Sequence, residues 1–124
     1  MDRTIPRDEL PHVVGKDELP FANIAHRFEG CRFGDVNVSF FLMESPPGKG
    51  AVLHFHPYEE IFITIEGEAT FTVGGEVIEA KAGQIVVAPA NVPHKFTNTG
   101  TGPLKQVDIH PRSRIQQTNI PEDE

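Results

Sequence analysis

Two histidines and a glutamate lie close together in the segment His54-Phe55-His56-Pro57-Tyr58-Glu59-Glu60. Residues two apart on a β-strand point to the same face, so His54 and His56 can converge on one point. Pro57 cannot donate a hydrogen bond to a neighbouring strand, so the strand must end or bend there. A tight corner could then bring Glu60 back beside the two imidazoles. Two histidines and one carboxylate around an open face form the ligand set of many non-haem metal sites.

A third imidazole comes from His94, which follows the rigid turn Pro-Ala-Asn-Val-Pro at 89–93. In an antiparallel sheet structure, residues far apart in sequence can meet on one inner face. His54, His56, Glu60 and His94 are therefore predicted to bind one divalent transition metal. The ligand set contains no thiolate, so Fe, Mn, Ni, Co and Zn all stay open. An octahedral metal would keep about two further positions for water, dioxygen or a bidentate substrate.

Short strands are expected to position these ligands. No window has a convincing helical period, and many segments are rich in β-branched and aromatic residues. Glu66-Gly67 and Gly74-Gly75 lie where hairpin turns need residues that tolerate positive φ. The pattern predicts a β-sandwich or barrel. The expected strands are 21–28, 36–44, 51–56, 60–65, 69–73, 76–80, 84–88, 94–98 and 104–110.

The composition of the chain limits the kinds of binding partner that are expected. The chain has 124 residues, enough for one domain, and a formal net charge of −7. No basic patch is visible, which argues against nucleic acid and against anionic membrane surfaces. No run of apolar residues is long enough for a membrane span, and residues 1–14 lack an apolar signal core, so we expect a cytoplasmic protein. Cys31 has no second cysteine to pair with, consistent with a reducing compartment.

Three segments are expected along the chain. Residues 1–20 form an N-terminal arm with two similar stretches, Arg7 to Pro11 and Lys16 to Pro20. Residues 21–111 form the β-domain. Residues 112–124 form a polar, acidic C-terminal tail that is either mobile or draped over the surface.

The spacing of these residues resembles the cupin superfamily. Residues 48–67 match its first motif, G-x5-H-x-H-x3-E-x6-G, at every fixed position. Residues 83–98 match its second motif, G-x5-P-x-G-x2-H-x3-N, with one departure: Asn91 stands where the motif has glycine. Asparagine tolerates the left-handed backbone better than other side chains, so we expect the turn to be retained.

The resemblance implies an all-β fold, an antiparallel β-sandwich barrel of the jelly-roll type, with a metal deep in one mouth. The family's ligand positions fall on His54, His56, Glu60 and His94. Cupins of this size commonly form homodimers, often by exchanging N-terminal strands, which would give the arm a role.

The surroundings of the metal suggest the kind of substrate. Tyr58, Phe62, Thr64, Phe96 and Asn98 are candidates for the pocket, because they lie at the corner or share a face with Glu60 or His94. Glu59 points to the opposite face and is expected at the surface. A largely apolar pocket with a few polar groups suits a small organic ligand, although each of these Phe residues could simply be core. His26 and His110 lie on expected strands and could support the metal ligands or act as acid–base groups, but we favour ordinary polar residues on a partly exposed face. For Cys31 we favour a partly buried small residue near a turn over a reactive thiol.

Three functions are compatible with such a site. The first is a dioxygenase-like oxidoreductase acting on a small, partly apolar chelating substrate. The second is an isomerase, cyclase or lyase that uses the metal as a Lewis acid. The third is a non-catalytic module that binds a metal and a ligand. The fold alone cannot choose among them, because it serves many reactions.

Overall fold

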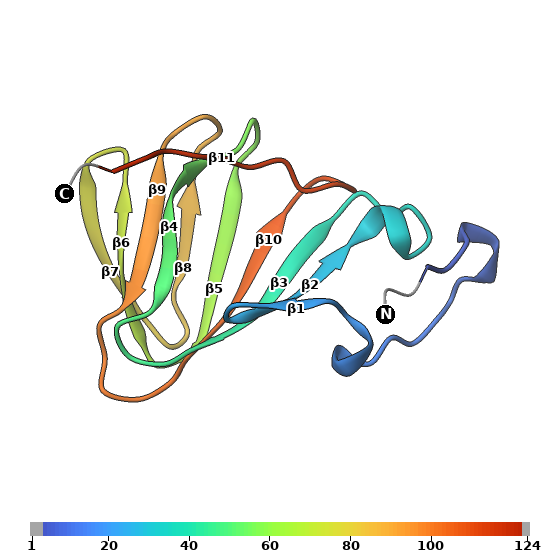
Figure 1. Ribbon diagram of the computed structural model, residues 1–124, viewed down its shortest axis with the longest axis horizontal. Coiled ribbons are helices and arrows are strands. Elements are labelled where there is room, and N and C mark those ends of the chain that lie inside the picture. The colour runs from blue at the N-terminus through green and yellow to red at the C-terminus, as the bar shows by residue number, and fades with distance from the viewer. Residues whose placement is uncertain (1–3, 123–124) are drawn as a thin grey trace.

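The computed structural model describes residues 4–122 and consists of two antiparallel sheets that face each other (Figure 1). The larger sheet has the strand order β1-β2-β3-β10-β5-β8, and the smaller sheet has the order β11-β4-β9-β6-β7. The strands of the larger sheet are β1 (Phe21–Ala22), β2 (Ala25–Glu29), β3 (Ser39–Ser45), β5 (Glu60–Glu66), β8 (Ile85–Ala88) and β10 (Leu104–His110). Those of the smaller sheet are β4 (Gly50–Phe55), β6 (Glu68–Val73), β7 (Glu76–Lys81), β9 (His94–Asn98) and β11 (Thr118–Asn119).

The prediction of an all-β antiparallel sandwich is confirmed. Among the described residues no strand pairing joins the two sheets edge to edge, so the structure is a sandwich and not a closed barrel. The helices of the described part of the chain are three short 3-10 turns, η1 (Arg7–Glu9), η2 (Lys16–Glu18) and η3 (Gly30–Arg32). Within residues 4–122 no helix is long and apolar enough to cross a membrane.

Strand alternation determines which side chains face the interior. On β5 every second residue from Glu60 to Thr64 is buried, and on β10 every second residue from Leu104 to His110 is buried. Between the sheets these faces meet a hydrophobic core built around Phe62, Phe71 and Phe96. The rings of Phe62 and Phe71 lie 5.0 Å apart in an edge-to-face arrangement. Inward polar residues lie on both sides of this core: Phe62 lies between Glu60 and Thr64 on β5, and Phe96 lies between His94 and Asn98 on β9.

The turn chemistry follows the prediction closely. Gly67, Gly74 and Gly75 all have positive φ angles. Asn91 has φ 64°, so asparagine does adopt the left-handed backbone at the position where the cupin motif has glycine. Asn23 also has a positive φ, 60°, and it turns the chain between β1 and β2. The single strand expected at 21–28 is therefore a tight hairpin.

Both ends of the described chain contact the sandwich. In the arm, Ile5 forms a parallel bridge with Phe33 and packs with Leu19 in a small second core. At the other end, β11 pairs with β4, Thr118 opposite Phe55 and Asn119 opposite His54. The C-terminal segment thus adds an edge strand to the smaller sheet, beside the strand that carries His54 (Figure 1).

Candidate metal centre

The four predicted ligands meet between the two sheets, each from the end of a strand. His54 lies near the end of β4, and its Cα is paired with that of His94, the first residue of β9. His56 follows β4 directly, and Glu60 begins β5 after the corner at Pro57. All four side chains are buried. Their ligand atoms lie within 4.8 Å of one another, so these four residues could hold one metal ion.

One carboxylate oxygen is the centre of the arrangement. Glu60 Oε1 lies 2.9 Å from His56 Nε2 and 2.9 Å from His94 Nε2. It lies 3.8 Å from His54 Nε2. Burial, the largest single influence, raises the pKa of Glu60, but close contacts with the ring nitrogens of His110, His54, His56 and His94 together bring that pKa well below its usual value. Glu60 is therefore a carboxylate, the form that binds metal.

The contacts of the Nδ1 atoms of His54, His56 and His94 show where each imidazole carries a proton. His56 Nδ1 lies 2.7 Å from the carbonyl of Gln116, and His94 Nδ1 lies 3.0 Å from that of Val92. His54 Nδ1 contacts the carbonyl of Val52 in the same way. A carbonyl can only accept, so each Nδ1 carries a proton. Each Nε2 faces Glu60 Oε1, with which it shares a proton when no metal is present, and it would present a lone pair to a bound metal.

This protonation pattern favours a cation at the centre. Three nitrogen lone pairs and a carboxylate oxygen face one another at close range in a buried space. Such an arrangement is stable only with positive charge between the atoms, supplied by a metal ion or, in its absence, by protons. Neutral imidazole and carboxylate ligands suit Mn, Fe, Co, Ni and Zn. The residues present thus fit a bound transition metal.

A cavity of about 210 Å³ opens beside this group. Its apolar lining includes Phe41, Met43 and Phe96, together with the β1–β2 hairpin. Asp108 and His110, both buried, line it next to His54 and Glu60. Among the described residues that line it there is no lysine or arginine. A ligand entering this cavity would meet His54 and Glu60 together with these apolar side chains.

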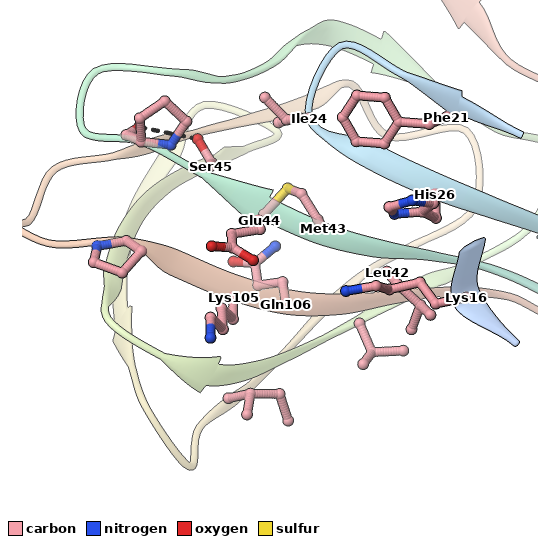
Figure 2. Close-up of a pocket in the computed structure, with 14 residues that line it drawn as sticks. Lys16, Phe21, Ile24, His26, Leu42, Met43, Glu44, Ser45, Lys105 and Gln106 are labelled. Carbon is pink, nitrogen blue, oxygen red and sulfur yellow. Dashed lines mark hydrogen bonds between the residues drawn. The ribbon is translucent and has the colours of Figure 1, made fainter. Parts of the chain in front are cut away.

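A larger hollow, of about 570 Å³, lies elsewhere (Figure 2). Its lining comes mainly from β1 to β3 and from β10, and includes Phe21, His26, Leu42 and Lys105. None of the four metal-ligand candidates lines it. The smaller cavity is therefore the candidate functional cavity, because His54 and Glu60 line it and none of the four metal-ligand candidates lines the larger hollow.

The five pocket candidates are placed in different surroundings. Phe96 lines the cavity beside the metal site, whereas Phe62 is wholly buried in the core. Thr64 is buried and its hydroxyl has no partner. Asn98 serves the backbone instead, since its side chain bonds the carbonyls of Ser45 and Gly102 and the amide of Gly100. Tyr58 is buried and bonds His110.

Asp108 and His110 are cavity residues outside the predicted set of metal ligands and pocket candidates. Both belong to the inward face of β10, where Leu104, Gln106, Asp108 and His110 alternate with outward residues. That alternation was visible in the sequence, and it could have shown that the four residues share one face. Which face turns inward depends on the pairing of β10 with β3 and β5.

We expect the stability of the metal-free protein to depend on pH through the pKa of Asp108. Burial and the nearby charge of Glu60 raise the pKa of Asp108 well above 3.8, against a hydrogen bond from Gln106. Because the pKa of Asp108 is higher in the folded than in the unfolded protein, its contribution to stability is fully present below about pH 3.8. That contribution is lost as the pH rises through the pKa of Asp108 in the folded protein. Asp108→Asn should therefore stabilise the protein at pH 7 by about 1 kcal/mol or more, and less below pH 4. Thermal unfolding of both proteins across this range measures the difference; a constant difference at all pH values would contradict it.

Comparison with known proteins gives the family. The model of the cupin domain family matches residues 41–110. The polyketide synthase CurC of Streptomyces cyaneus is 32% identical over 62 residues, which are 49% of this chain and 40% of that protein. The HTH-type transcriptional regulator PuuR of Escherichia coli is 34% identical over 55 residues, 44% of this chain and 30% of that protein. The chain thus spans less than half of these curated relatives.

Solved structures share the fold. The Lactobacillus farciminis oxalate decarboxylase in its formate complex has a TM-score of 0.75 at 21% identity, covering 84% of this chain and 34% of that one. The Bacillus subtilis oxalate decarboxylase with Mn(II) centres has a TM-score of 0.73 at 22% identity, covering 84% and 30%. The family match spans more than half of this chain and all four candidate metal ligands. This protein belongs to the cupin domain family.

Proposed function

We propose that this protein is a metal-dependent enzyme, a dioxygenase-like oxidoreductase acting on a small, partly apolar chelating substrate. The observation that carries the proposal is the convergence of three Nε2 atoms and Glu60 Oε1 beside a mostly apolar cavity of about 210 Å³. Four protein ligands leave about two positions of an octahedral metal, enough for a bidentate substrate or for dioxygen. A bound transition metal would supply chelation of the substrate and access to dioxygen chemistry.

The charges in the cavity favour a weakly acidic chelator. Three neutral imidazoles and one carboxylate leave a divalent metal with a net charge of about +1. Asp108 can add negative charge but no positive charge, and no lysine or arginine is found among the described lining residues. A singly charged chelator, such as an enolised diketone or a catechol, balances this site. A dianion such as oxalate would leave excess negative charge in a buried space.

The chain's own residues would orient such a substrate. Phe41, Met43 and Phe96 offer apolar contacts and exclude water, while Asp108 and His110 offer hydrogen-bonding groups on the same side as Glu60. In a dioxygenation both oxygen atoms enter the substrate, which itself supplies the electrons, so no separate reductant is needed.

A Lewis-acid isomerase, cyclase or lyase is the second candidate. The observation that favours it is the 32% identity to a polyketide synthase over 62 residues. Asp108 and His110, close to the ligand group, are of the types that serve as general acids and bases. A non-catalytic binding module is the third candidate, and the partial likeness to a transcriptional regulator is compatible with it.

Oxygen consumption separates these functions. Protein loaded with Fe(II), and separately with Mn(II) or Ni(II), would be mixed with acetylacetone, a flavonol or catechol in air, with oxygen uptake and products followed together. We expect uptake matched by oxygenated product. Substrate conversion without uptake would favour the Lewis-acid candidate. Tight binding without conversion would favour the binding module.

We also propose a homodimer as the working assembly. Ile65, Ile85 and Val87 project from β5 and β8 with exposed fractions of 58%, 61% and 55%. Ile65 also lines the larger hollow of Figure 2, so the exposed apolar side chains adjoin that hollow. Apolar side chains gathered on one sheet face are typical of a surface that a second subunit covers.

A further inference from the structure

Glu60 uses its two carboxylate oxygens differently. Oε1 faces His54, His56 and His94, as described above. Oε2 lies 3.2 Å from Nε2 of His110, a fully buried residue outside the four-ligand group. The contact is close, yet the imidazole N–H is not aligned for a regular hydrogen bond. It is therefore an electrostatic contact that depends on a proton at His110 Nε2.

Tyr58 determines where that proton lies. Its hydroxyl is 2.7 Å from His110 Nδ1, and it accepts a hydrogen bond from the Gln116 amide at 3.2 Å. A tyrosine hydroxyl ordinarily carries its proton at neutral pH. The alternative acceptor, the Gln116 carbonyl, is more distant at 3.4 Å. Tyr58 thus donates to His110 Nδ1, and the imidazole carries its own proton on Nε2, toward Glu60.

Packing holds both rings in place. Tyr58 is stacked on His56 with ring centroids 5.1 Å apart and an interplanar angle of 10°. Phe41 meets the His110 ring edge-on, with centroids 5.5 Å apart. The Arg112 guanidinium lies over the Tyr58 ring, 5.2 Å from the ring centroid. A side chain so confined can keep a carboxylate in one orientation without a perfectly aligned hydrogen bond.

We propose that Tyr58 and His110 are positioning residues that hold Glu60 Oε2 away from the metal, so that Glu60 binds through Oε1 alone. A carboxylate that binds through one oxygen occupies one coordination position, and one that binds through both occupies two. The Tyr58–His110 pair thereby keeps a position free for substrate. This inference rests on the metal site and not on which reaction the site performs.

The test uses Co(II)-loaded protein and acetylacetone as a bidentate probe. His110→Phe removes the contact to Oε2 at similar volume, whereas His110→Gln keeps an N–H donor. We expect both variants to bind about one equivalent of Co(II). Acetylacetone affinity should fall at least about tenfold in His110→Phe and return to within about threefold of the original in His110→Gln. The visible Co(II) spectrum before the probe is added should change in His110→Phe, because Glu60 gains a second bond to the metal.

Two further variants complete the design. Tyr58→Phe removes one oxygen and should change acetylacetone affinity in the same direction as His110→Phe; it carries the test if His110→Phe fails to fold. His26→Phe makes the same change on β2, at a residue that lines the larger hollow. It should leave the acetylacetone affinity and the Co(II) spectrum unchanged. Unaltered acetylacetone affinity in both Tyr58→Phe and His110→Phe would overturn the proposal, as would His110→Gln behaving like His110→Phe. Absence of oxygen chemistry would leave the proposal standing.

Discussion

Glu60→Gln is expected to lower the affinity for a divalent transition metal by more than about 100-fold. Loss of a residue that only supports a metal ligand typically costs about 10 to 100-fold, and Glu60 is itself the candidate ligand at the centre of the group. The amide has nearly the same shape, so the change removes the negative charge and leaves the size. Four imidazoles then lose the carboxylate that they surround.

The neighbouring acid provides a matched control. Glu59 is exposed and points away from the group, so Glu59→Gln removes the same charge from the same turn. Metal content by mass spectrometry after purification without chelators, together with competition against a chromophoric chelator, measures the affinity. One tightly bound equivalent in Glu60→Gln would show that the metal is held elsewhere. We expect loss in Glu60→Gln and full retention in Glu59→Gln.

Gly50→Ala is expected to destabilise the protein by about 3 kcal/mol or more. A Cβ at residue 50 would overlap the backbone carbonyl of Phe96 on β9. A backbone atom within a sheet cannot move aside as a side chain can, so β4 would have to shift away from β9. Gly50 opens β4, which has a register irregularity between Ala51 and His54. The shift would therefore reach His54, and metal affinity should fall together with stability.

Gly102→Ala is the control for this change. A Cβ at residue 102 meets no atom within 4 Å, so little change in stability is expected. Chemical denaturation of the metal-free proteins gives the free energies of unfolding, and Co(II) titration gives the affinities. A Gly50→Ala protein with unchanged unfolding midpoint would mean that β4 and β9 separate at little cost, contrary to the close approach of the two strands.

Most of the metal site was predictable from local patterns. Strand alternation placed His54 and His56 on one face, and Pro57 marked the corner before Glu60. The left-handed turn at Asn91, just before His94, follows from the backbone preferences of asparagine. These features depend on neighbouring residues, whose geometry the covalent chain largely dictates.

The surroundings of the metal site were decided by tertiary structure. Alternation places Asp108 and His110 on one face of β10, but only its pairing with β3 and β5 turns that face toward Glu60. Asn98 shares a face with His94, yet its amide donates to the carbonyls of Ser45, at the end of β3, and of nearby Gly102, and it does not line the cavity. The edge strand β11 likewise has no strong pattern of its own and exists because β4 offers it unpaired backbone groups. Sequence alone determined which residues could bind the metal, because their types and spacing match a known ligand set. Long-range strand pairing brought His94 beside His54 and decided what surrounds the metal, because it chooses which faces meet.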